Sequence, residues 1–213
     1  MQLADGCVIA TDSEEVAGAA REHGADVVLT SAEHASGTDR VAEVAARREY
    51  LDFDAIVNVQ GDEPFVPASA LRGAVHHVIS GNFPLGTAAA RASDAILVEP
   101  SVVKVVAADD GRAMYFSRAA IPFLRDAAEA HLRSTRVWQH IGVYAYARDA
   151  LATWVSLPPH PLELIERLEQ LRPLAAGLAM GVALVNEPAQ IGVDTAEDLE
   201  RANAHWTEFE ERS

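Results

Sequence analysis

Short apolar runs alternate with longer amphipathic segments along this chain. Apolar runs that end at turn-forming residues predict buried strands. Segments with apolar positions three and four residues apart, preceded by Ser, Thr, Asp or Pro, predict helices. The predicted strands cover residues 7–10, 27–30, 55–60 and 182–186, and the predicted helices cover 13–23, 38–50, 67–80, 148–156, 161–172 and a segment that starts at Thr195. This alternation predicts one α/β domain over residues 1–213, with a mostly parallel sheet covered by helices.

Residues 86–146 follow a different pattern. Their apolar segments are short and β-rich, at 102–107, 113–117 and 141–146, and turns such as Asp109-Asp110-Gly111 separate them. Closely spaced short strands are typical of antiparallel pairing. We therefore expect a small β-rich excursion from the main sheet.

The charge of the chain narrows the possible partners. With 32 acidic and 17 basic residues, the formal net charge is −15. Such a surface repels nucleic acid and anionic lipid, so we expect neither nucleic acid nor a membrane as a partner. A phosphorylated ligand would need metal ions or a local group of cations. The single cysteine, Cys7, lies in an apolar run and is interpreted as a small core residue in a protein of the reducing cytoplasm.

Two aspartates are candidates for metal chemistry. Asp62 follows the strand predicted at 55–60, and Asp194 follows the last predicted strand at the start of a helix. If the two strands are parallel neighbours, both carboxylates lie on one rim of the sheet, where they suit Mg²⁺ beside phosphate oxygens. In the simpler alternative, Asp62 is an ordinary turn residue and Asp194 caps a helix.

Ser36-Gly37-Thr38 is a polar turn that leads into a predicted helix. Backbone N–H groups and hydroxyls at a helix N-terminus could hold a base or a ribose. An ordinary helix cap, with Arg40 in solvent, explains the same residues equally simply.

Two further groups could bind an acidic sugar, and two cations lie in or beside the β-like segments. His140 and Tyr144 alternate along one strand and share a face. Glu166 and Gln170 are four residues apart on the helix predicted at 161–172, so they also share a face. The cations are Lys104 and Arg118, and each could meet a carboxylate or a phosphate. Each group also has a structural interpretation: a core histidine, a solvated helix stripe and an ion pair.

Taken in order, these segments resemble the 3-deoxy-manno-octulosonate cytidylyltransferases, also called CMP-Kdo synthetases. The resemblance covers about residues 8–202, and its ordered series is more specific than any single piece. It rests on IATD at 9–12, HASGTDR at 34–40, VNVQGDEP at 57–64, VKVV at 103–106, YFSR at 115–118, HIGVYAY at 140–146, PLELIERLEQLR at 161–172 and GVDTAEDL at 192–199.

The resemblance implies a Rossmann-like nucleotidyltransferase fold of the glycosyltransferase-A type, a homodimer and Mg²⁺. It also implies transfer of CMP from CTP to the sugar acid Kdo, for lipopolysaccharide synthesis, with residues 86–146 contributing to dimerisation and sugar binding. The implied ligands are Asp62 and Asp194 for the metal, Ser36, Thr38, Arg40 and Gln60 for the nucleotide, and Arg118, His140, Tyr144, Glu166 and Gln170 for Kdo.

One part of the family pattern has no counterpart in residues 1–213. Family members begin with a strand and a basic Pro-Ala-Arg loop that cradles the triphosphate, and the first βα unit of that kind is absent here. We therefore expect unpaired strand edges and low or no activity from this chain. Two alternatives stay open: a catalytically silent homologue that acts as a dimer partner, and a cytidylyltransferase for another sugar acid, such as a sialic acid.

Overall fold

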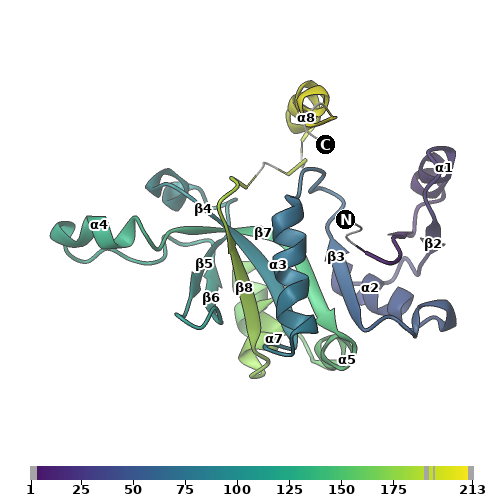
Figure 1. Cartoon of the computed structure of the whole chain (residues 1–213), viewed down its shortest axis with the longest axis horizontal. Helices are drawn as coiled ribbons and strands as arrows, with labels where there is room; N and C mark the ends of the chain where they lie inside the picture. The colour runs from purple at the N-terminus through teal and green to yellow at the C-terminus, as the bar shows by residue number, and fades with distance from the viewer. Residues whose placement is uncertain (1–3, 190–191, 194, 211–213) are drawn as a thin grey trace.

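The computed structural model describes residues 4–189, 192–193 and 195–210. A six-stranded sheet forms the centre of the molecule (Figure 1). In the order β6-β5-β7-β4-β8, with β3 also paired to β7, its strands are β3 (Ala55–Val59), β4 (Leu85–Arg91), β5 (Lys104–Ala107), β6 (Ala113–Ser117), β7 (Trp138–Ala147) and β8 (Met180–Val185).

The sheet is mixed, so the prediction of a mostly parallel sheet is wrong. Within it, only β4 and β8 pair in parallel among the described residues, whereas β7 runs antiparallel to β3, β4 and β5. The reason is the excursion between β4 and β7. Because the chain returns from it without a crossover helix over the sheet, β7 enters between β3 and β4 in the opposite direction. Consequently β3, β4 and β8 still point the same way.

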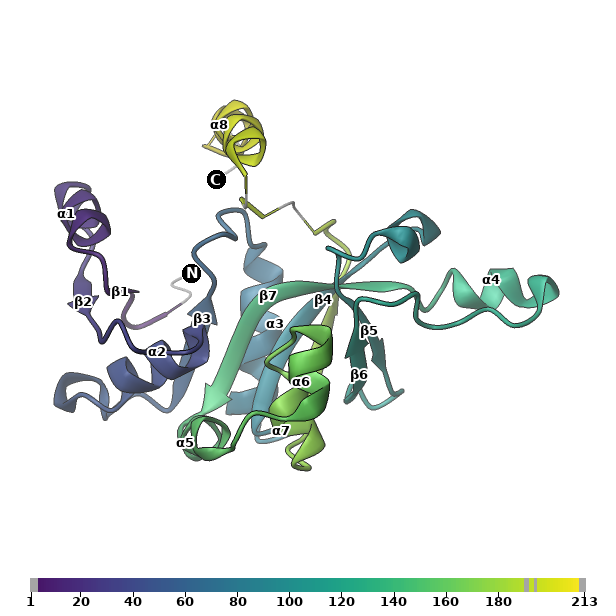
Figure 2. The same cartoon turned by 180° about the vertical axis from the view of Figure 1, so that it is seen from behind.

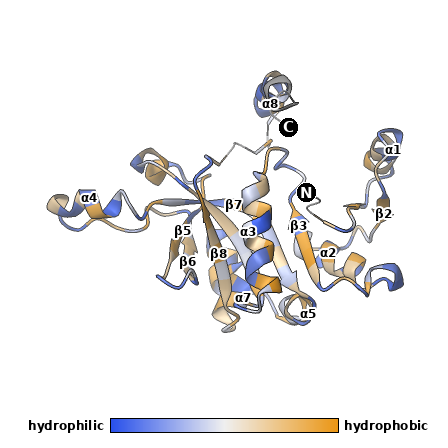
Figure 3. Ribbon diagram, viewed as in Figure 1, coloured by the Kyte–Doolittle hydropathy of each residue, from blue (hydrophilic) through white to orange (hydrophobic). Residues whose placement is uncertain are grey.

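Helices cover both faces of the sheet. Helix α3 (Ala68–Ile79) lies on one face (Figure 1), and α5 (Arg148–Ser156), α6 (Pro161–Glu166) and α7 (Leu171–Ala175) lie on the other (Figure 2). Hydrophobic and hydrophilic positions alternate around α3 (Figure 3). Two apolar clusters follow this division, one beneath α3 and one among the aromatic side chains of the opposite face.

Small residues bring α3 very close to the sheet. A Cβ atom on Gly86 of β4 would lie 2.1 Å from the carbonyl oxygen of Ala74, and one on Gly73 would lie 2.4 Å from the Cβ of Ala183. Only glycine therefore fits at these two positions. The composition of β4, LGTAAAR, follows from this contact, and it explains why the hydrophobic pattern did not predict the strand.

The N-terminal elements form a separate small layer beside β3 (Figure 1). Strands β1 (Ile9–Thr11) and β2 (Val27–Leu29) pair in parallel, and α1 (Glu14–Glu22) connects them. Helix α2 (Gly37–Ala45) and a 3₁₀ turn at Arg48–Tyr50 lead on to β3. Among the described residues, β1 has no strand partner besides β2, and β3 has none besides β7.

The placement of Cys7 in the core is wrong. Strand β1 begins two residues later than predicted, at Ile9, and Cys7 precedes it as an exposed, free thiol. The apolar run therefore misled the prediction of burial, because the first residues of the run lie outside the strand.

An arm extends from the sheet beside β5 (Figure 1). It carries a 3₁₀ turn at Ala127–Glu129 and the short helix α4 (Ala130–Arg133), and a second 3₁₀ turn at Asp94–Val98 lies before β5. A cavity of about 470 Å³ lies at its base, lined by apolar side chains and by five charged residues: Arg125, Asp126, Glu129, Arg133 and Arg136.

Helix α8 (Ala196–Glu210) stands at the edge of the molecule, where His205 and Trp206 pack their rings against Phe65. None of the helices in the described part of the chain is long and apolar enough to span a bilayer.

Candidate functional site

The predicted site residues gather where one edge of β7 changes partner. On this edge β7 pairs with β5 at residues 138–139 and with β3 at residues 143–147. Between these two pairings, the His140 amide donates to the Val103 carbonyl at 2.9 Å, and the Gly142 carbonyl accepts from the Gln60 amide at 3.4 Å. The sheet therefore splits at His140–Gly142.

A β-bulge lies at the same point on the opposite edge of β7. Thr87 of β4 faces Tyr144, but the next residue, Ala88, faces Ile141, so Gly142 and Val143 are extra residues relative to β4. Bulges redirect side chains and are frequent beside functional sites. The split and the bulge together make this the most irregular part of the sheet.

The predicted nucleotide residues converge from α2 and β3. Ser36 is the N-cap of α2, and its hydroxyl accepts from the Asp39 amide at 3.2 Å. The next residue, Gly37, packs against the Gln60 side chain, because a Cβ atom there would lie 3.2 Å from the Gln60 amide group. Thr38 is fully buried. Ser36, Thr38 and Gln60 therefore lie in one place, and their predicted contact with a nucleotide stays a prediction.

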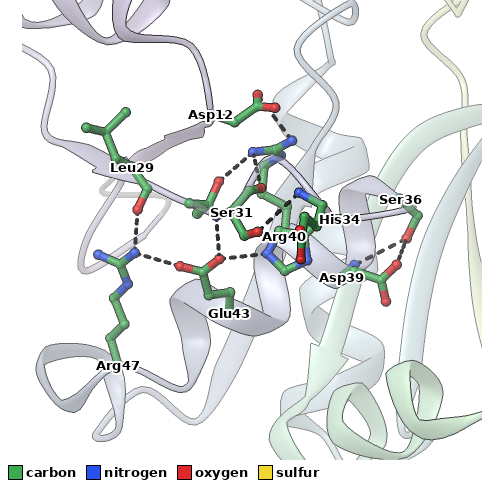
Figure 4. A network of polar contacts seen from close by, with 11 residues as sticks. Asp12, Leu29, Ser31, His34, Ser36, Asp39, Arg40, Glu43 and Arg47 are labelled. Carbon is green, nitrogen blue, oxygen red and sulfur yellow. Dashed lines mark hydrogen bonds and ion pairs between the residues drawn. The ribbon is translucent and has the colours of Figure 1, made fainter.

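Arg40 is engaged within the protein. Its Nη1 donates to the Thr30 hydroxyl at 2.5 Å, and its Nη2 lies 3.2 Å from the Asp12 carboxylate (Figure 4). These contacts fasten β1 and the loop after β2 to α2. In this structure Arg40 links α2 to Thr30 and Asp12, and its predicted contact with nucleotide stays a prediction.

Glu43 is the centre of the same polar network (Figure 4). Its carboxylate accepts from the Ser31 amide at 2.9 Å, from His34 Nε2 at 2.6 Å and from Arg47 at 2.7 Å. These hydrogen bonds, led by that of the Ser31 amide, lower the pKa of Glu43 to about 2. Glu43 thus remains charged and holds the loop that precedes Ser36.

The predicted sugar residues of β7 lie on the face covered by α5–α7. The His140 ring packs edge-on against Phe116, with a centroid distance of 5.0 Å, and lies 5.4 Å from the Tyr144 ring. Tyr144 in turn stacks on Tyr146. Burial lowers the pKa of His140 to about 3 and raises the pKa of Tyr144 well above its usual value. Both side chains are therefore neutral hydrogen-bonding groups at neutral pH.

Glu169 belongs to this site, although the sequence analysis did not select it. Its Oε1 accepts from the Thr38 hydroxyl at 2.9 Å, and Thr38 also lies 3.4 Å from the Tyr146 hydroxyl. Its Oε2 is buried and has no hydrogen-bond partner among the described residues. Burial raises the pKa of Glu169. An unpaired buried carboxyl oxygen is costly, and it marks a place where a ligand donor would be favourable.

The single helix predicted at 161–172 is wrong, and with it the shared face of Glu166 and Gln170. Helix α6 ends at Glu166, and Arg167 takes a left-handed conformation with φ of 55°. The two residues therefore lie on different elements. A buried ion pair between Glu163 and Arg172 fixes the break, with a distance of 2.5 Å. The turn between α6 and α7 brings Glu169 to Thr38 and buries Gln170.

Glu166 makes its observed contacts with the end of β6. It accepts from the Ser117 hydroxyl at 2.6 Å and from the Arg118 amide at 3.0 Å. Both of its carboxylate oxygens thus hold the chain around Arg118. The predicted contact of Glu166 with a sugar stays a prediction.

The guanidinium of Arg118 is fixed by backbone carbonyls. Its Nε donates to Glu166 at 2.9 Å, and its Nη1 donates to Pro100 and Ser101 at 3.1 Å each. Within the described residues, its Nη2 makes no hydrogen bond. Arg118 is therefore a cation held in place by the protein, and its Nη2 remains available to donate a hydrogen bond to a ligand.

Lys104 supports Arg118 from inside the sheet. It is fully buried, and its ammonium donates to the carbonyls of Glu99, Val102 and Arg118 at 2.5–3.0 Å. Burial lowers the pKa of Lys104. Its full burial identifies Lys104 as a structural residue.

Asp62 lies on the rim beyond β3, with an exposed side chain. Its carbonyl accepts from the Val193 amide at 2.7 Å, so the chain segment just before Asp194 reaches Asp62. Strands β3 and β8 are not neighbours, because β7 and β4 lie between them. Asp194 itself lies outside the described residues, and the paired metal site stays a prediction. No group of three or more potential metal-ligating side chains occurs in the described part of the chain.

Comparison with known proteins agrees with this geometry. The cytidylyltransferase family matches residues 1–183. A 3-deoxy-manno-octulosonate cytidylyltransferase of Gemmatimonas aurantiaca is 63% identical over 204 residues, which are 96% of this chain and 79% of the relative. The enzyme of the same name from Stenotrophomonas maltophilia is 43% identical, over 92% of this chain and 79% of the relative.

A solved structure is also similar throughout. It is that of a CMP:2-keto-3-deoxy-manno-octonic acid synthetase complexed with CTP, with a TM-score of 0.85 and 35% identity over 95% of this chain and 81% of that one. The prediction of a Rossmann-like nucleotidyltransferase α/β fold is confirmed. By fold and by sequence, this chain belongs to the 3-deoxy-manno-octulosonate cytidylyltransferase family.

Proposed function

We propose that this protein transfers CMP from CTP to Kdo. The anomeric hydroxyl of Kdo attacks the α-phosphorus of CTP, a new P–O bond forms, and the bond to the bridging oxygen breaks. Pyrophosphate leaves with the electron pair of that bond, and the hydroxyl proton passes to solvent. Such a displacement needs positioning and charge neutralisation, not a side-chain nucleophile.

The observation that carries the proposal is that a positioned cation follows the strand that packs against the split in β7: Arg118 comes directly after β6, whose Phe116 ring contacts the His140 ring. Arg118 supplies the positive charge that an acidic sugar requires in a chain of net charge −15. His140 and Tyr144 supply neutral polar atoms on the same face. Gln170 follows Glu169 in the turn that contacts Thr38, so the sugar and nucleotide residues adjoin.

Mg²⁺ would be held at the rim of the sheet, by Asp62 and by Asp194. The exposed carboxylate of Asp62 is a suitable hard oxygen ligand, and the Val193–Asp62 hydrogen bond supports the pairing. When bound, the ion would neutralise charge on the phosphate oxygens. Asp62 would also orient the approach of the two substrates at this rim.

Calorimetry with Kdo and with CTP, followed by an assay of pyrophosphate release with Mg²⁺, tests this function. We expect Kdo to bind wild type and to bind Arg118→Met at least about tenfold more weakly, since a charge-assisted contact is lost. A matched control is Arg125→Met on the arm.

Absence of Kdo binding would contradict the proposal. Preference for a sialic acid would change the identity of the acceptor sugar. Binding without turnover would favour the silent homologue, and a normal turnover would contradict the expected low activity.

We also propose a homodimer formed through the arm. Phe123 and Leu132 of the arm are 81% and 55% exposed, and an apolar cavity lies beside them. Exposed apolar side chains of this size favour burial against a second copy. Sedimentation analysis should give a dimer for wild type and a monomer for Phe123→Asp; a wild-type monomer would contradict it. The cytoplasmic location and the role in lipopolysaccharide synthesis stay predictions.

A further inference from the structure

Thr87 lies beneath His140. The proposed function gives no role to its side chain. It sits in the middle of β4, fully buried, on the face of the sheet that carries His140 and Tyr144. Its hydroxyl lies 2.9 Å from His140 Nε2 and 2.7 Å from the carbonyl oxygen of Val143. Both distances are those of good hydrogen bonds.

The position of one proton follows from counting donors. A threonine hydroxyl has a single proton to donate, and a carbonyl oxygen can only accept. The proton of Thr87 is therefore given to Val143. The contact with His140 can then exist only if the imidazole donates, so Nε2 carries the imidazole proton.

The β-bulge makes this arrangement possible. Gly142 and Val143 are extra residues relative to β4, so the regular pairing between the strands is interrupted there. The Thr87 side chain supplies the hydrogen bond to the Val143 carbonyl at this interruption. Thr87 thus connects the irregular backbone of β7 to the His140 ring.

The opposite ring nitrogen is left with a lone pair. Burial keeps His140 neutral at neutral pH, and a neutral imidazole with a proton on Nε2 has an acceptor at Nδ1. Within the described residues, Nδ1 makes no hydrogen bond. It is therefore available to a hydroxyl group but would repel a carboxylate.

We propose that Thr87 is a positioning residue that fixes His140 in the Nε2–H form, so that Nδ1 accepts a hydrogen bond from a hydroxyl of the acceptor sugar. This inference rests on the proposed function, because it assigns His140 to the sugar. Two residues then recognise different groups of the sugar acid. Arg118 binds its carboxylate, and His140 accepts a hydrogen bond from one of its hydroxyl groups.

The tautomer can be measured without substrate. Two-bond ¹H–¹⁵N spectra of ¹⁵N-labelled protein distinguish the protonated from the unprotonated nitrogen of each imidazole, and His140→Gln assigns the signal among the eight histidines. We expect wild type and Thr87→Ser, which keeps the hydroxyl, to show the proton on Nε2. Thr87→Val keeps the volume but loses the hydroxyl, so its His140 should shift toward the Nδ1–H form.

A wild-type spectrum with the proton on Nδ1 overturns the proposal, as does an unchanged tautomer in Thr87→Val. The wild-type spectrum alone is decisive, so the test remains valid even if Thr87→Val does not fold.

Calorimetry with Kdo and CTP tests the link to the sugar. Thr87→Val should weaken Kdo binding about tenfold, whereas Thr87→Ser should change it by less than about threefold. CTP binding should be unchanged in both variants, which a general loss of structure would not allow. If wild type shows the expected tautomer but does not bind Kdo, the proposed function fails and the sugar contact fails with it. If wild type binds Kdo but Thr87→Val binds it equally well, only the role of Thr87 is overturned.

Discussion

The two faces of the central sheet are built on opposite principles. Beneath α3, small residues such as Gly86, Ala88 and Ala90 allow backbone to approach backbone. On the opposite face, large rings with polar atoms, Tyr144 and Tyr146, fill the space beneath α5–α7. On one face the backbones of helix and sheet are in close contact. On the other, large side chains fill the space, and their polar ends need hydrogen-bond partners.

This difference explains where the site lies. The close contact between α3 and the sheet at Gly73 and Gly86 leaves no room for a ligand between them. On the aromatic face, hydroxyls and the imidazole must be satisfied when buried, and Thr38 and Glu169 provide part of that network. On this face, Oε2 of Glu169 is a buried carboxyl oxygen without a hydrogen-bond partner among the described residues, and it points to function there.

The largest effect is expected from Gly86→Val, which tests the close-packed face. The new Cβ would lie 2.1 Å from the Ala74 carbonyl oxygen, so α3 must move away from β4. We expect a loss of about 3 kcal/mol or more in the free energy of unfolding, measured by urea denaturation. The control is Gly18→Ala in α1, where nothing lies within 4 Å of the new Cβ. It should gain about 0.8 kcal/mol from helix propensity. Equal stability of the two variants would remove the contrast between the faces.

Arg172→Met tests the support of the opposite face. It leaves the buried Glu163 without its partner at the break between α6 and α7. A buried ion pair broken on one side costs about 3 kcal/mol, which thermal or urea unfolding would report. Arg201→Met removes an exposed pair on α8 and should change stability by less than about 0.5 kcal/mol. An unchanged free energy of unfolding in Arg172→Met would show that the turn carrying Glu169 does not depend on the ion pair with Glu163.

The third prediction concerns pH and His140. Burial lowers the pKa of His140 in the folded protein to about 3, from its ordinary value of 6.5. Between these two values the unfolded chain binds a proton that the folded protein does not. Stability therefore falls as pH falls from 6.5, by up to about 1.4 kcal/mol per pH unit from this group.

Urea unfolding of wild type and His140→Gln at pH 5 and pH 7 isolates this contribution, because other titrating groups, such as Glu169, are common to both proteins. Wild type should lose more stability than His140→Gln on going to pH 5. Parallel behaviour of the two proteins would mean that His140 is protonated within the fold.

The smallest effect is expected from Glu166→Gln. The amide puts an N–H₂ group against the Ser117 hydroxyl or the Arg118 amide, where the carboxylate now accepts both bonds. Loss of one such bond costs about 1 kcal/mol, which corresponds to about fivefold weaker Kdo binding in calorimetry if Arg118 is displaced. CTP binding should not change. The control is Glu129→Gln on the exposed arm. Equal Kdo affinity in the two variants would show that Glu166 does not contribute to sugar binding.

Much of the fold could be predicted from local sequence. The helices predicted at 67–80 and 148–156 are α3 at Ala68–Ile79 and α5 at Arg148–Ser156, and the strand predicted at 55–60 is β3 at Ala55–Val59. These elements have clear periodicity and clear ends, so each is specified by its own residues. The ordered motifs likewise gave the family and brought Ser36, Thr38 and Gln60 into one group.

Other features depend on partners far away in the chain. Strand β4 consists of small residues because α3 lies against it, and nothing in LGTAAAR itself indicates a central strand. The direction of β7 depends on how the excursion returns. The helix break at Arg167 has no Gly or Pro to signal it and is held by the contact between Glu163 and Arg172.

The sequence by itself therefore determined the family, most of the helices and strands, and the chemistry available to the site. Only the tertiary structure decided that Glu169 faces Thr38, that Glu166 holds Arg118, and that Thr87 lies under His140. The physical reason is the range of the interactions. Periodicity and capping act between near neighbours, whereas a hydrogen bond between residues 53 or 131 positions apart exists only after the sheet has formed.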